Sequence, residues 1–219
     1  MSEFIFDSTR EDDKVYWEYI CSYKDLSESF IEKYQDKVEW HLVSMCQKLS
    51  ESFIEKHQDK LNWYMISAFQ KLSEAFIEKH RDEVEWGYIS IHQKLSESFI
   101  KKHADKINWD YISIYQKLSE SFIEKHADKV DWDMIKRFQK LSDKFCEKHE
   151  IKSDILNIVH GCGKFNRCVF ILKSDPDTIY IGCFSGTKDK AIKAIKEKYS
   201  NREDVMNDYI AKVEECFNY

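Results

Sequence analysis

Histidine recurs at one fixed spacing along this chain, and its charge changes close to physiological pH. The positions, each 23 residues after the last, are His57, His80, His103, His126 and His149. Such a row could bind a metal, relay protons or sense pH. Zinc needs three or four converging ligands, and rings about 10 Å apart on successive helix pairs could not share one ion. Because Tyr34 fills the equivalent earlier position, we interpret these rings as packing groups bonded to backbone, glutamine or glutamate.

A second set of residues with chemical potential lies near the C-terminus. It comprises His160, Cys162, Cys168 and Cys183. These side chains could ligate zinc, but they include one close pair and no Cys-x-x-Cys, so we predict no metal site and no cofactor.

The stretch GCFSGTK stands between an expected strand and an expected helix, as a phosphate loop would. A Walker A loop has four residues between its glycines and a lysine before its hydroxyl residue, whereas here three residues intervene and Thr187 precedes Lys188. The helix N-terminus could still attract an anion. This alternative anion or nucleic-acid site would consist of Ser185, Gly186, Thr187, Lys188, Lys190 and Lys193.

Tyr180-Ile181-Gly182 resembles the second half of the GIY-YIG nuclease motif. The first half would be Val169-Phe170-Ile171, which matches poorly, and Lys190 and Lys193 stand where that family has an arginine. Without that electrostatic clamp the resemblance implies a degenerate, inactive relative. We therefore expect no enzyme activity.

A 23-residue repeat must position the histidine row. Its register includes every tryptophan of the chain: Trp17, Trp40, Trp63, Trp86, Trp109 and Trp132. In each unit a serine such as Ser27 is placed to cap a first helix, and Leu26 and Ile31 have hydrophobic-staple spacing. A second helix begins near each tryptophan. The residues in its cap position are Glu39, Asn62, Glu85, Asn108 and Asp131.

One such helix pair cannot bury its apolar face alone, whereas stacked copies can. We therefore predict a mainly α protein, an α-solenoid of five helix-pair repeats with a small C-terminal α+β domain. Acidic residues begin the first helices and lysines end them, which favours macrodipole stabilisation over a phosphate-binding stripe.

The expected domains are an N-terminal cap with a half-repeat (1–25), the solenoid (26–150) and the α+β domain (151–219). In the last, strands at 168–174 and 178–184 flank Asp-Pro-Asp and predict a hairpin. Two helices should follow, the first capped by Thr187, while 153–160 could be either helix or strand.

The composition narrows the function. The net charge is −6 with dense mixed charge, which argues against a general nucleic-acid binder. Seven cysteines without framework spacing, no secretory signal and no membrane-spanning run predict free thiols in the cytoplasm.

The unit LSExFIxKHxDxVxWxxISxxQK resembles short helical repeats carried by proteins of large DNA viruses and bacteriophages. IYIGCFSGTKDKAIKAIKEKY resembles a small C-terminal module of some viral repeat proteins. The resemblance implies a viral accessory protein in the infected cell's cytoplasm, and it supplies no catalytic residues.

We expect a protein-binding repeat protein whose partner is a host protein, such as a defence factor. A repeat keeps its frame and varies its exposed face to suit a partner, although drift at tolerant positions would look the same. The varying positions are Tyr64, Phe69, His92, Asp110, Tyr115 and Asp133. The alternatives are a nucleic-acid or nucleotide binder acting through the C-terminal domain, and a self-assembling structural protein.

Overall fold

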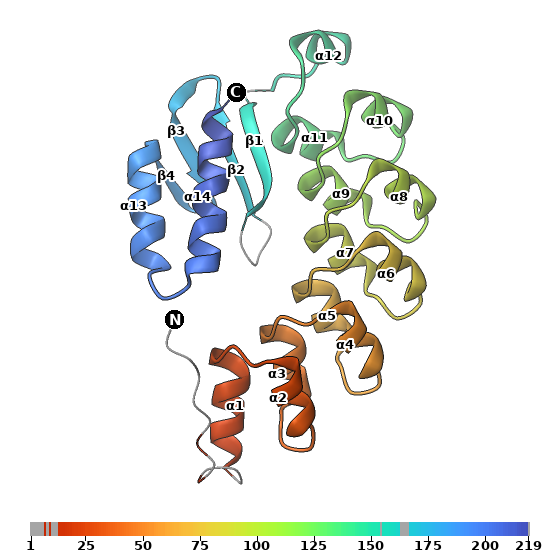
Figure 1. The fold of residues 1–219 in the computed structure, drawn as a ribbon. Helices are drawn as coiled ribbons and strands as arrows, with labels where there is room; N and C mark the ends of the chain where they lie inside the picture. Colours follow the sequence, from red (N-terminus) through yellow and green to blue (C-terminus); the bar gives the residue numbers. More distant parts are fainter. Residues whose placement is uncertain (1–6, 8, 10–12, 154, 163–166, 219) are drawn as a thin grey trace. The chain divides into compact units, whose positions relative to one another are not determined.

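The computed structural model describes residues 7, 9, 13–153, 155–162 and 167–218, with 161, 162 and 167 described by backbone alone. The chain forms two compact units, Met1–Ile89 and Ser90–Tyr219. Each contains stacked helix pairs, and the second also contains a sheet with two further helices (Figure 1). The expected domain boundary at 150 stays a prediction.

The solenoid alternates two kinds of short helix, and we keep two names for them. The A helices are α2 (Glu28–Lys33), α4 (Glu51–Lys56), α6 (Glu74–Lys79), α8 (Glu97–Lys102), α10 (Glu120–Lys125) and α12 (Asp143–Lys148). The B helices are α1 (Lys14–Tyr23), α3 (Trp40–Cys46), α5 (Trp63–Phe69), α7 (Trp86–His92), α9 (Trp109–Tyr115) and α11 (Trp132–Phe138). Within each unit the A helices form one layer and the B helices a second. The predicted solenoid of 23-residue helix pairs is confirmed.

Each A helix begins at the serine that the sequence predicts. The hydroxyl of Ser50, for example, accepts from the backbone N–H of Phe53 at 3.2 Å, which satisfies a donor that the helix leaves unpaired. Four residues into the helix an isoleucine, such as Ile54, is fully buried. The staple leucine before each cap, such as Leu49, is also buried, so both ends of the motif lie in the core.

Three of the predicted B-helix caps, Asn62, Asn108 and Asp131, bond to their helices through the side chain. Asn62 accepts from the N–H of Met65 at 3.1 Å, and Asn108 and Asp131 do the same in their repeats. Glu39 makes no side-chain cap bond. Its carboxylate has an additional methylene and lies 3.8 Å from Nδ1 of His41 instead, so Glu39 occupies the predicted cap position without bonding to the helix through its side chain.

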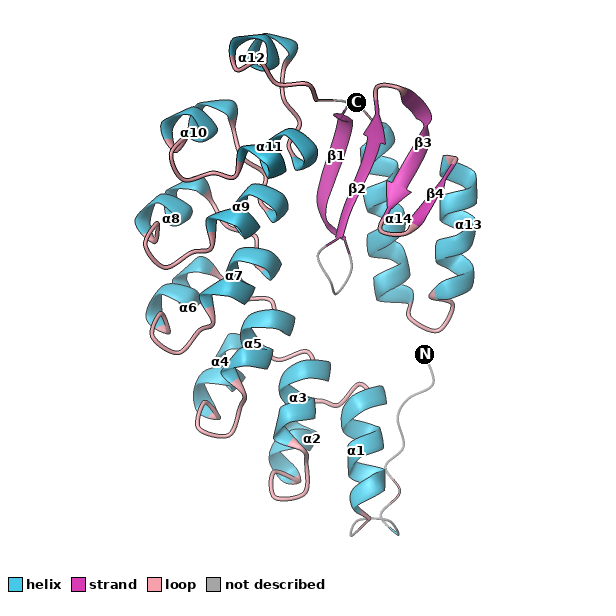
Figure 2. Cartoon of the chain, turned by 180° about the vertical axis from the view of Figure 1, so that it is seen from behind, coloured by secondary structure: helices cyan, strands magenta, loops and turns pink. Residues whose placement is uncertain are grey.

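The second unit ends in a four-stranded antiparallel sheet of order β1-β2-β3-β4. Its strands are β1 (Ile155–Cys162), β2 (Arg167–Leu172), β3 (Asp175–Ile181) and β4 (Phe184–Gly186). Helices α13 (Lys188–Lys198) and α14 (Glu203–Phe217) cover one face (Figure 2). Val169, Ile171 and Ile179 are fully buried beneath them.

The predicted hairpin and the two helices are confirmed, and the ambiguous segment 153–160 contributes most of β1. Two details differ. The turn lies at Lys173-Ser174, so Pro176 is part of β3 rather than of the turn. Thr187 takes the cap position of α13 but makes no side-chain cap bond. No helix among the described residues has the length and apolar character that a membrane span requires.

Candidate functional site

A buried glutamine at the end of the B helices α3, α5, α9 and α11 joins one repeat to the one before it. Nε2 of Gln70 donates to the carbonyl oxygens of Ser44 and Gln47, both at 2.8 Å. Its Oε1 accepts from the backbone N–H of Leu49 at 3.1 Å. The same three-bond pattern is made by Gln47, Gln116 and Gln139. Buried backbone groups need such partners, so this glutamine is structural. Sequence reasoning missed it, although its recurrence every 23 residues was visible.

The acidic residue that opens an A helix also acts between repeats. Oε1 of Glu28 accepts from the backbone N–H of Ser50 at 2.6 Å, and Glu97 bonds Ser119 in the same way. A serine in the B helix also bonds to the next repeat: Oγ of Ser44 accepts from the backbone N–H of Asn62 at 3.0 Å. These side chains are therefore part of the stacking, beyond the macrodipole role predicted from sequence.

The histidine row consists of packing rings. His57 lies 5.2 Å from Trp40 of the preceding B helix and 4.5 Å from Phe53 of its own helix, centroid to centroid. His80, His126 and His149 contact their Trp and Phe neighbours in the same way. Tyr34 takes the equivalent place 5.3 Å from Trp17. The packing part of the interpretation agrees with these contacts, whereas Nε2 of His80 and of His126 has no hydrogen-bond partner in the described part of the chain, so the predicted polar bond is not made at that nitrogen.

A glutamate near the end of one A helix reaches the next A helix. Oε1 of Glu32 lies 2.7 Å from Nζ of Lys56 and 3.4 Å from Nε2 of His57. Hydrogen bonds from Lys56 and His57 hold the pKa of the Glu32 carboxyl below its usual value. We call this three-residue contact a glutamate bridge. Two others, involving Glu55 with Lys79 and His80, and Glu124 with Lys148 and His149, lie elsewhere in the stack.

The zinc candidates contain one close pair. Sγ of Cys168 lies 3.3 Å from Nδ1 of His160. Cys183 is exposed at the end of β3, and the side chain of Cys162 lies outside the described residues. Among the described residues, no three His, Cys, Asp or Glu side chains are placed to hold a metal ion.

The Cys168–His160 pair also lacks the character of a nucleophile with its base. Burial lowers the pKa of His160 to about 4. Hydrogen bonds to the backbone of Phe138 and Ile114 act in the opposite direction, but their effect on the pKa is smaller. Burial raises the pKa of Cys168 to about 12. A reactive thiolate–imidazolium pair requires shifts in the opposite directions, so both groups are held neutral.

The anion candidate does not form a loop. Phe184–Gly186 is strand β4, in which Ser185 pairs with Tyr180 and Gly186 with Ile179. Lys190 and Lys193 are exposed on α13, whereas Lys188 lies over the Phe217 ring at 5.7 Å. The two GIY-YIG-like triplets pair across the hairpin, with Phe170 stacked on Tyr180 at 5.2 Å. The site stays a prediction.

An apolar cavity of about 320 Å³ opens between β3, β4 and α13. Cys183 and Tyr199 contribute to its wall, together with buried Ala191, Ile195 and Tyr209. Apolar side chains dominate the lining, so this cavity has little means of orienting a polar substrate.

The predicted partner-binding residues all lie on B helices, but their surroundings differ. Tyr64 is exposed, with its hydroxyl hydrogen-bonded to that of Tyr88 and the rings 4.4 Å apart. Asp110 and Asp133 are exposed, whereas Phe69 and His92 are half-buried. Tyr115 is also half-buried. Its burial raises the pKa of its hydroxyl, and the nearby Cys168 raises it further.

The C-terminal sheet covers the B helices around Tyr115 in the second unit. In the second unit β1 packs against α11. Sγ of Cys168 lies 3.9 Å from the carbonyl oxygen of Ile114 in α9. In the turn at the other end of β2, Lys173 forms an ion pair with Asp143 of α12 at 2.8 Å. The uncovered face of the sheet thus contacts the chain's own B helices.

Compared with known proteins, the chain matches no protein family, no curated protein and no solved structure.

Proposed function

We propose that this chain is a non-enzymatic repeat protein that binds a protein partner on the face formed by its B helices. One observation carries the proposal. Among the described residues, every exposed large hydrophobic side chain lies on a B helix: Val15, Tyr19, Tyr23, Tyr64 and Tyr111.

Three of these residues form a stripe along α1. Val15, Tyr19 and Tyr23 are spaced by four residues, so they share one side of the helix. Tyr23 is 77% exposed, and its ring lies 5.5 Å from that of Tyr19. Tyrosine combines a large apolar ring with a polar hydroxyl and is enriched at protein interfaces. Contiguous exposed apolar surface of this kind indicates an interaction site.

The A helices show the opposite pattern. Their frame residues are used in caps, ion pairs and core packing, and their exposed side chains are polar or charged except for the small Ala75. In the second unit, moreover, the B helices already bind a folded element, because the sheet packs against α9 and α11 through Cys168 and His160. A surface that holds a sheet in this way is suited to a folded partner.

The resemblance of the repeat to those of large DNA viruses and bacteriophages supports a narrower proposal, that the partner is a host protein and the chain acts in the infected cell's cytoplasm. A host defence protein is the partner class that fits an accessory protein without catalytic residues.

Substitution of the exposed tyrosines tests the proposal. A quadruple variant, with Tyr19, Tyr23, Tyr64 and Tyr111 replaced by serine, should bind a partner captured from host lysate at least about tenfold more weakly once that partner is purified. The matched control replaces three exposed lysines, each between a B helix and the following A helix, by serine and should bind normally: Lys71, Lys94 and Lys117.

The same measurements decide between the alternative functions. Binding that is unaffected by the tyrosine changes and falls steeply with salt would favour nucleic acid at Lys190 and Lys193. A mass that rises with protein concentration in light scattering, and falls in the tyrosine variant, would favour self-assembly.

A further inference from the structure

One A helix departs from the pattern of glutamate bridges. Lys101 of α8 stands at the position held by Glu32, Glu55 and Glu124 in other A helices. The residues across from it in α10 are Lys125 and His126, which correspond to the Lys56 and His57 of a glutamate bridge. We call Lys101, Lys125 and His126 the lysine rung. It keeps the lysine and the histidine of a glutamate bridge and replaces the carboxylate by a second lysine.

One ring nitrogen of the lysine rung, Nε2 of His126, is left without a hydrogen-bond partner among the described residues. His126 is 9% exposed, and its Nε2 is buried with no hydrogen-bond partner. Its ring is held in the normal place, 5.3 Å from Trp109 and 4.4 Å from Phe122. Nε2 of His80 also has no hydrogen bond, but a carboxylate oxygen of Glu55 lies 3.6 Å away. A buried polar atom of this kind is uncommon and destabilising.

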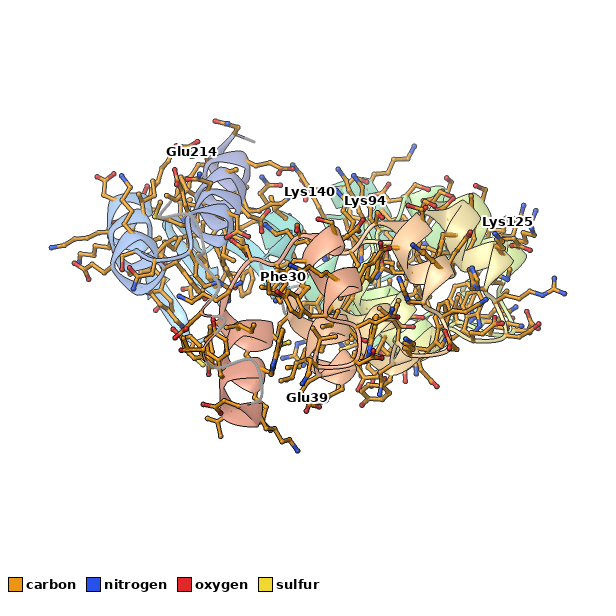
Figure 3. All side chains as sticks on the ribbon, turned by 60° about the horizontal axis from the view of Figure 1, so that its bottom comes forward. Phe30, Glu39, Lys94, Lys125, Lys140 and Glu214 are labelled. Atoms are coloured by element: carbon orange, nitrogen blue, oxygen red, sulfur yellow. The ribbon has the colours of Figure 1, made fainter. Side chains whose placement is uncertain are left out.

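The charges around His126 are mainly positive. Burial lowers the pKa of His126, and Lys129, Lys125 and Lys101 lower it further, whereas Asp128 opposes them. Lys101 and Lys125 are both exposed, and Lys125 lies on an outer edge of the ribbon (Figure 3). The rung is thus open to solvent at its two ammonium groups and closed at its imidazole.

We propose that the lysine rung binds a carboxylate side chain of an acidic protein segment, at the position a glutamate occupies in the glutamate bridges. The incoming oxygen would bond to Nζ of Lys125 and Nε2 of His126 as Glu124 bonds to Lys148 and His149. The exposed side chain of Lys101 moves aside from the imidazole and adds a second ammonium contact. This surface belongs to the A helices, so it is separate from the B-helix face proposed above.

The surroundings favour one carboxylate over a polyanion. Acidic residues flank the members of the rung in the sequence of both helices: Glu97, Asp105, Glu120, Glu124 and Asp128. These would repel the successive phosphates of a nucleic acid, whereas a single carboxylate can enter between them. The frame that orients such a group is already formed, since α8 and α10 have the length, caps and ring contacts of the other A helices.

Two substitutions test the site: one converts the lysine rung into a glutamate bridge, and the other converts a glutamate bridge into a lysine rung. Lys101→Glu supplies the carboxylate from the chain itself, so it should stabilise the fold and close the site. Glu124→Lys should create a second lysine rung at Lys148 and His149. Because the first variant gains a bridge, loss of binding in it cannot result from unfolding.

The probe is an end-blocked peptide with a single acidic residue, Gly-Gly-Glu-Gly-Gly, and its binding is followed by NMR of the histidine ring resonances at low salt. In the wild-type protein it should shift the His126 resonances saturably, with at least about tenfold weaker binding in Lys101→Glu. In Glu124→Lys the His149 resonances should respond as well. No saturable shift up to about 10 mM peptide, or an equal response in Lys101→Glu, would overturn the proposal. So would a larger response to a single-stranded DNA decamer than to the peptide.

Discussion

Nε2 of Gln116 lies 2.8 Å from the backbone carbonyl oxygen of Gln93, one repeat earlier. The same amide also bonds to the carbonyl of Ser90 at 2.9 Å, and its oxygen accepts from the N–H of Leu95. Each glutamine therefore uses its side chain to satisfy main-chain groups at the end of one B helix and at the start of the following A helix.

Replacing Gln116 by leucine should destabilise the second unit by about 2–5 kcal/mol, because three buried backbone groups would lose their partners. Urea unfolding followed by tryptophan fluorescence measures the change. Lys117→Leu, at the exposed neighbouring position, should stay within about 0.5 kcal/mol of wild type. Equal effects of the two substitutions would contradict the structural role of the glutamine.

His57 should be replaceable by tyrosine but not by alanine. Tyrosine occupies the equivalent place at Tyr34 and can fill the space beside Trp40 and Phe53. We expect His57→Tyr to remain within about 1 kcal/mol of wild type, and His57→Ala to cost about 2–3 kcal/mol through lost ring packing. Thermal unfolding of the three proteins provides the comparison, and a tyrosine variant as unstable as the alanine variant would refute the packing role.

The second unit should lose stability in mild acid because of His160. In the unfolded chain this imidazole has its ordinary pKa of 6.5, whereas in the folded unit its pKa is about 4. The unfolded state therefore binds more protons between these values, so stability is complete above pH 6.5 and is lost as the pH falls toward 4. The loss should reach about 2 kcal/mol at pH 5.

Urea unfolding at pH 7.5 and pH 5 measures that loss, and His160→Gln should reduce it to the residual effect of the other histidines. The Glu32 and Glu124 carboxyls do not interfere, because their lowered pKa values place their titration at more acidic pH. A wild-type protein with unchanged stability at pH 5 would show that His160 is protonated in the folded state.

The described cysteines should differ sharply in reactivity. Cys183 is exposed, whereas Cys168 and Cys216 are desolvated with pKa values raised to about 12. At pH 8 the buried thiols would hold about a thousandfold less thiolate than an ordinary cysteine. Brief alkylation of the native protein, read by peptide mass spectrometry, should label Cys183 first. Early labelling of Cys168 would mean that the sheet separates readily from α9.

The parts of the fold that depend on residues close in sequence were predictable. Ser50 with Ile54 and Asn62 with Met65 act within one helix turn, so spacing alone predicts the caps and staples. The role of Gln70 depends on carbonyl oxygens 23 and 26 residues earlier. Local patterns do not show which main-chain groups stacking leaves unpaired, and the same limit hid the bond from Glu28 to Ser50.

For the candidate site, the sequence could predict which positions vary but not which residues cover them. The varying positions predicted a binding face on the B helices, but the sequence could not show that Tyr115 lies beside the chain's own Cys168. Lys101 was visible as the exception to a glutamate position. Its meaning emerged only when the glutamates of other A helices were found bonded to the Lys and His of the next repeat.

The glutamine contacts also bear on how such a chain changes over generations. Every bond of Gln70 and Gln116 runs to the repeat immediately before, and the groups it meets are the same each time. Unequal recombination between near-identical copies would add or remove 23 residues and leave each surviving junction chemically unchanged. The length of the proposed binding surface can therefore evolve by copy number, and point substitutions such as that at Lys101 would give individual copies their own specificity.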